Sequence, residues 1–131
     1  MKFVYDDGGR SKYFKASNVS DCAIRAISIA TQKDYKEVYN ALKKLNGGKS
    51  CRDGTPKKVG KKYLISIGWK WHPCMTFGSG CQVHLTREEL PNGRIVAEVS
   101  RHLVAIVDGV IHDTYDCSRE GSRCVYGYWT K

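Results

Sequence analysis

The sequence predicts an α+β domain in which helices fill the first half of the chain and an antiparallel sheet fills the second. Three helical patterns lie between residues 20 and 68. From Trp69 onward the chain changes to short β-rich runs separated by glycine, proline and asparagine, which is typical of antiparallel strands. A length of 131 residues fits one domain. Helices and strands segregated in this way are characteristic of the α+β class.

The first predicted helix begins at Cys22, after a short strand at residues 2–5. Ser20 or Asp21 is placed to cap it, or Asn18 if the helix starts earlier. Such side chains accept a hydrogen bond from a free backbone N–H of the first turn. Cys22 is therefore expected in the first turn of the helix.

This helix is apolar on nearly all sides, because only Arg25 and Ser28 interrupt the apolar residues that follow Cys22. Such a helix is typically buried inside a domain. A thiol at its start lies near the positive end of the helix dipole, and a partner imidazole would lower its pKa further. Without such a partner, Cys22 would be one more buried cysteine.

Two more helices are predicted, one from residue 35 to its end at Gly47-Gly48 and one over residues 56–67. The second follows Asp34, and a glutamate three residues later completes a pattern that resembles a capping box. The third follows Thr55 and has Pro56 at its first position, where proline is favoured. Apolar residues recur at helical spacing in both segments.

The second half of the chain is predicted to form strands at residues 69–72, 94–100, 102–107, 110–115 and 124–129, with a one-turn helix at residues 86–89. Asp108-Gly109 suits a two-residue type I′ hairpin turn. In that register His102 and Asp113 lie on one face of the sheet as diagonal neighbours, a separation that side chains can bridge. His112 and Asp116 project to the other face.

The net charge of +9 is concentrated in residues 43–62, where eight basic residues face a single aspartate, for a net +7. Such a segment could attract nucleic acid or an acidic protein partner. A solvated face is the favoured reading, because the segment has a helical pattern without an array of aromatic residues for base stacking.

The six cysteines are expected to be reduced thiols, since the chain begins with no signal peptide and has no apolar run long enough to span a bilayer. These features predict a cytoplasmic protein without a membrane partner. Three disulfides remain formally possible. A zinc site is a less favoured alternative, because its ligands lack the short spacing of structural sites; they would be Cys74, Cys81 and His84, perhaps with His72.

The order of Cys22 at a helix start, His102 on one strand and Asp113 on the next resembles the papain-like cysteine peptidase superfamily. The small bacteriocin-leader-processing peptidases and related phage- and plasmid-encoded proteins look closest. The resemblance covers the core elements but not residues 43–92. It implies that Cys22 is the nucleophile, that His102 is the general base and acid, and that Asp113 orients the histidine. Asn18 is the nearby candidate for the oxyanion hole.

The resemblance implies that residues 1–131 form a single papain-like domain, with the catalytic cysteine at the start of the central helix. We expect a thiol hydrolase, a peptidase or isopeptidase, that acts on a protein or peptide through a thioester acyl-enzyme without metal or organic cofactor. It would act in the cytoplasm, of the host cell if phage-encoded. Two alternatives stay open: a basic binding protein on the same fold without turnover, which would use residues 43–62, and a thiol acyltransferase.

Overall fold

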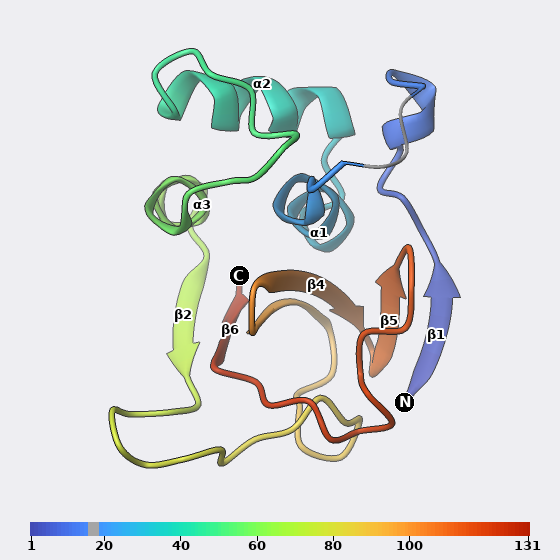
Figure 1. The fold of residues 1–131 in the computed structure, drawn as a ribbon, viewed down its shortest axis with the longest axis vertical. Helices are drawn as coiled ribbons and strands as arrows, with labels where there is room; N and C mark the ends of the chain where they lie inside the picture. Colours follow the sequence, from blue (N-terminus) through green and yellow to red (C-terminus); the bar gives the residue numbers. More distant parts are fainter. Residues whose placement is uncertain (16–18) are drawn as a thin grey trace.

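The computed structural model describes residues 1–15 and 19–131, which contain three α-helices and a six-stranded mixed sheet (Figure 1). The α+β class is therefore confirmed. The helices are α1 (Cys22–Thr31), α2 (Tyr35–Leu45) and α3 (Lys57–Ser66), and a short 3-10 helix, η1, spans Arg10–Lys12. The strands are β1 (Lys2–Tyr5), β2 (Lys70–Pro73), β3 (Arg94–Val99), β4 (His102–Val107), β5 (Val110–Asp113) and β6 (Gly127–Thr130).

The sheet has the strand order β1-β5-β4-β3-β6-β2, and the prediction of a purely antiparallel sheet is wrong at one edge. There β1 pairs with β5 in parallel, with Lys2 opposite Val110 and Tyr5 opposite Asp113. The other pairs are antiparallel. The two strands come from distant parts of the chain, so no hairpin signal fixes their relative direction.

The β4–β5 hairpin has the predicted register. Val107 lies opposite Val110, and Ile106 opposite Ile111. Both residues of the connecting turn, Asp108 and Gly109, have positive φ, as a type I′ turn requires. Because the register is confirmed, the relative placement of His102 and Asp113 follows directly from this turn.

The central position of α1 matches the apolar pattern of its sequence. In Figure 1, α1 lies between α2 and the sheet, and every residue from Ala23 to Ala30 is buried. The opposite face of the sheet has its own apolar cluster, in which Leu85 and Leu90 come from the segment before β3 and Val125 from the segment before β6. The sheet is thus covered on both faces.

Two local predictions of secondary structure are wrong. Residues 86–89 form a turn rather than a one-turn helix, and Thr86 Oγ1 donates to Glu89 Oε2 at 2.8 Å, a contact between side chains rather than the backbone hydrogen bonds of a capping box. The last strand starts at Gly127 instead of Cys124, which forms only an isolated bridge with His84. The spacing of Thr86 and Glu89 therefore brings the two side chains together without forming the predicted helix.

The expectation that all cysteines are reduced is also wrong, because Cys81 and Cys124 form a disulfide. It joins the segment between β2 and β3 to the segment that leads into β6, across 43 residues of chain. This bond removes Cys81 from the zinc site considered above. No helix in residues 1–15 and 19–131 is long and apolar enough to cross a bilayer.

We predict that Gly127→Ala destabilises the fold. A Cβ atom at this position in β6 would overlap the indole ring of Trp71 and approach the backbone oxygen of His72 to 2.9 Å. Overpacking of this kind costs about 1–3 kcal/mol of unfolding free energy, measurable by urea denaturation. The control is Gly60→Ala in α3, where nothing lies within 4 Å of the added Cβ. Equal stability of the two variants would contradict the packing described for Gly127.

Candidate active site

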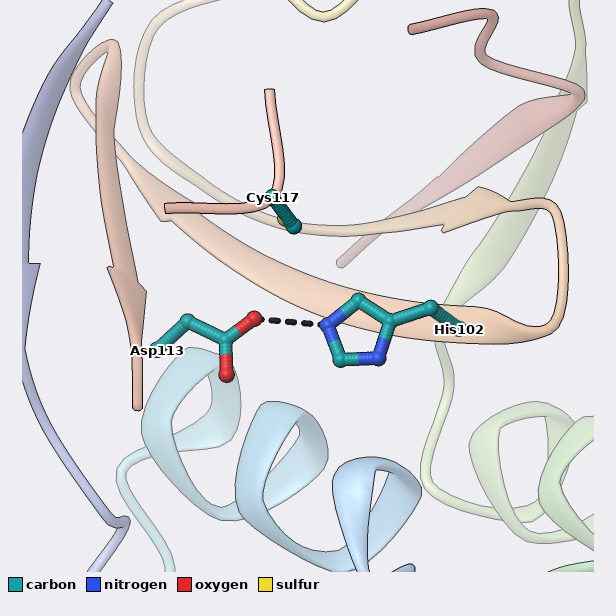
Figure 2. A group of neighbouring side chains, drawn as sticks. All are labelled: His102, Asp113 and Cys117. Atoms are coloured by element: carbon teal, nitrogen blue, oxygen red, sulfur yellow. Dashed lines mark hydrogen bonds and ion pairs between the residues drawn. The ribbon is translucent and has the colours of Figure 1, made fainter. Parts of the chain in front are cut away.

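Cys22, His102 and Asp113 meet where the start of α1 approaches one end of the β4–β5 hairpin. Cys22 is the first residue of α1, His102 the first of β4 and Asp113 the last of β5. Figure 2 shows the imidazole of His102 facing Asp113, with 2.6 Å between Nε2 and Oδ2. Asp116 instead accepts hydrogen bonds from Ser118. The structure thus brings the three predicted residues together and leaves Asp116 apart.

The Cys22 thiol is half-buried and has a pKa below its ordinary value. Burial alone would raise the pKa, because it penalises the thiolate. The hydrogen-bonding interaction and charge of His102, the backbone N–H of Leu103 and the charge of Arg25 together outweigh this effect. The thiolate therefore forms more readily at Cys22 than at an ordinary cysteine, which is the change that nucleophilic cysteine chemistry requires.

The opposite change occurs at His102, whose pKa is raised from its ordinary value of 6.5 to about 11. Burial alone would lower it, but the hydrogen bond to Asp113 stabilises the imidazolium, and so do the thiols of Cys117 and Cys22. The pKa shifts, upward at His102 and downward at Cys22, both favour a thiolate–imidazolium pair. The same pair can accept and return one proton.

Asp21 lies at the centre of a buried network that the sequence did not reveal. Its side chain is fully buried and accepts hydrogen bonds from Arg10 at 3.0 Å, Arg25 at 2.9 Å and the hydroxyl of Tyr35 at 2.6 Å. Asp21 is the N-cap residue of α1, yet its side chain makes no capping hydrogen bond. The expected cap is thus replaced by tertiary contacts that fix the start of the helix.

Arg25 connects this network to the histidine. The Nε of Arg25 donates to Asp21, and its Nη1 donates to Asp113 Oδ1 at 2.8 Å. The other oxygen of Asp113, Oδ2, forms the hydrogen bond with His102. The backbone N–H of Thr114 also donates to Oδ1. Both oxygens of Asp113 are therefore occupied, and the carboxylate has one orientation in which it can hold the imidazole.

A cleft of about 600 Å³ opens beside Cys22 and His102. It lies between α3 and the turn that joins β3 to β4, so residues distant in sequence share its walls. Trp71 and Trp129 line it, with ring centroids 5.2 Å apart. The thiol and the imidazole are thus accessible from a space large enough for part of a peptide.

Cys117 is a further thiol beside His102. It comes from the segment after β5 and lies on the opposite side of the ring from α1 in Figure 2. Ligand atoms of Cys117, His102 and Asp113 lie within 4.8 Å of one another, as a metal site requires. However, the 2.6 Å contact between His102 and Asp113 leaves no space for an ion between them, so these residues fit proton exchange better than metal binding.

Sequence reasoning located the three central residues but missed those that support them. Arg25 appeared only as an interruption of an apolar helix. A charged residue in such a helix, four positions after an aspartate, was the available signal for a buried ion pair. Cys117 was considered only as a free thiol or as part of a zinc site, and nothing in the sequence placed it beside His102. Asn18, the predicted oxyanion candidate, lies outside the described residues.

Comparisons of the chain with protein-family models, with curated proteins and with solved structures find no match. The function is therefore inferred from the chemistry of the site.

We predict that Arg25→Met lowers the unfolding free energy by about 3–5 kcal/mol, because it leaves the buried carboxylates of Asp21 and Asp113 without their shared partner. The matched control is Lys33→Met, which removes the exposed pair between Lys33 and Glu37 and should cost less than about 1 kcal/mol. Urea denaturation of both variants measures the difference. Similar values for the two would show that Arg25 does not hold the site together.

Proposed function

We propose that this protein is a cysteine-dependent hydrolase, a peptidase or isopeptidase, with Cys22 as nucleophile. The observation that carries the proposal is the chain of contacts from Cys22 through His102 to Asp113 at the edge of a cleft. The resemblance to papain-like peptidases in the order and placement of these residues supports the same reaction class. Catalysis of this kind needs a nucleophile, a base and a group that orients the base.

In the first half of the reaction the Cys22 thiolate attacks the carbonyl carbon of an amide bond. A C–S bond forms, and the carbonyl electrons move onto oxygen. When the tetrahedral intermediate collapses, the C–N bond breaks, and the imidazolium of His102 gives its proton to the departing amine. The products are a free amine and a thioester on Cys22, with His102 now neutral.

In the second half, water attacks the thioester and His102 accepts its proton. The C–S bond breaks, the acid product leaves, and the thiolate–imidazolium pair is restored. Asp113 supports both steps by holding Nε2 of His102, which leaves the other ring nitrogen for the proton exchange. Arg25 acts indirectly in this scheme, as a positioning residue for Asp113.

The negative charge that develops on the carbonyl oxygen needs donors close to the thiol. The first backbone N–H groups of a helix have no partner within the helix, and α1 has no side-chain cap at this end. The backbone N–H of Cys22 is therefore a donor beside the reacting carbon. Asn18, three residues before Asp21 in the chain, keeps its predicted role as a second donor.

The test uses an electrophilic peptide probe that reacts with an activated thiol. We predict that Cys22→Ala abolishes labelling and that His102→Ala slows it by at least about 100-fold, because the thiolate loses its counter-ion and base. Asp113→Ala should also slow labelling strongly. The control is Asp116→Ala, which removes a nearby carboxylate that does not contact His102. Intact-protein mass spectrometry gives the rates, and circular dichroism verifies folding.

The probe must also prefer Cys22 over Cys74, a half-buried free thiol whose pKa is raised by burial. Labelling of Cys74 at the same rate would contradict an activated nucleophile. Loss of labelling in folded Asp116→Ala, with normal labelling in Asp113→Ala, would show that the triad is wrongly assigned.

A further inference from the structure

The cleft beside the thiol has an apolar floor and a basic rim. Leu64, Trp71 and Trp129 supply apolar surface. The charged residues that line the cleft are all basic except for one glutamate; they are Lys57, Lys58, Lys61, Arg101 and Glu98. A substrate that fills this space must therefore meet both apolar surface and positive charge.

Most of this positive charge has no partner within the protein. Lys57 pairs with Glu98 at 3.1 Å, which neutralises the one acidic residue of the cleft. Within residues 1–15 and 19–131, no carboxylate forms an ion pair with Lys58, Lys61 or Arg101, and all three residues are exposed. Three cations thus remain for a ligand.

These three cations lie around the reacting groups, Cys22 and His102. Lys58 and Lys61 lie three residues apart on α3, so they project from one side of that helix. Arg101 lies in the turn immediately before His102, on the other wall of the cleft. The basic segment recognised in the sequence is therefore divided: part of it lines the cleft, whereas residues such as Lys62 do not.

We propose that the cleft binds an acidic peptide segment, with carboxylates held by Lys58, Lys61 and Arg101 and an apolar side chain packed against Trp71, the half-buried tryptophan of the cleft. This inference rests on the proposed function, because it names the substrate class for the reaction at Cys22. Lys58 and Lys61 come from one wall of the cleft and Arg101 from the other, so carboxylates of the substrate can meet a cation on either wall.

Peptide is favoured over nucleic acid by the position of the charges. Nucleic acid binding without sequence preference uses a groove that follows the phosphate backbone, with exposed aromatic rings for base stacking. Here the cations surround a confined cleft that contains a thiol, and Trp129 is buried. A thiolate attacks acyl carbon, which peptides provide.

The experiment measures binding separately from catalysis. Cys22→Ala is titrated with two fluorescein-labelled peptides of equal length and equal aromatic content, one rich in glutamate and one rich in lysine. Fluorescence anisotropy should show binding of the acidic peptide at least about tenfold tighter, and salt should weaken it. Adding Lys58→Glu, Lys61→Glu and Arg101→Glu together to Cys22→Ala should reverse the preference. Tighter binding of the lysine-rich peptide would also show that this variant is folded. Lys62→Glu, a single charge reversal outside the cleft, should keep the preference, whereas Lys61→Glu alone, the matched single reversal inside the cleft, should weaken it.

Equal binding of the two peptides, or the same loss of preference in Lys62→Glu, would overturn the proposal. So would displacement of the acidic peptide by a single-stranded oligonucleotide at lower concentration, which would assign the cleft to nucleic acid. Probe labelling of Cys22 in the unmodified protein reports on the hydrolase separately. Labelling without acidic preference would overturn the substrate class alone, whereas acidic preference without labelling would overturn the hydrolase and leave the cleft as a binding site.

Discussion

The site depends on one buried interaction, the contact of Arg25 with both Asp21 and Asp113. Asp21 precedes α1, Arg25 lies one turn inside it, and Asp113 ends β5, so this one side chain joins the helix that carries the thiol to the hairpin that carries the imidazole. Burying such charges is unfavourable unless all of them are paired. The network therefore penalises any arrangement in which α1 and the hairpin move apart, and this constraint keeps Cys22 beside His102.

The parts of the fold that depend on local signals could be predicted from the sequence. The Asp108-Gly109 turn determined the hairpin register, and the register placed His102 beside Asp113. The apolar pattern after Cys22 predicted a buried helix. Contacts between distant segments could not be predicted in this way: Arg25 and Asp113 are 88 residues apart, and β1 meets β5 without a connecting turn to set its direction.

The fold shows which of the basic residues in the sequence lie together beside the candidate site. As a linear segment, residues 43–62 are interpreted as a solvated face more readily than as a binding surface. In three dimensions Lys58 and Lys61 face a cleft that also contains the proposed nucleophile, while Lys62 lies outside it. Arg101, far from this segment in sequence, completes the rim. The proposed reaction and the proposed substrate class therefore both rest on residues that line the same cleft.

The central claim is that Cys22 and His102 form an ion pair held by Asp113, and the most direct measurement is the protonation state of His102. Nitrogen NMR of the ¹⁵N-labelled protein, with the four histidines assigned by substitution, reports whether one or both ring nitrogens carry a proton. Because the pKa of His102 is raised to about 11, both nitrogens should stay protonated from acid through neutral pH. Loss of one proton near the ordinary value of 6.5 would contradict the ion pair.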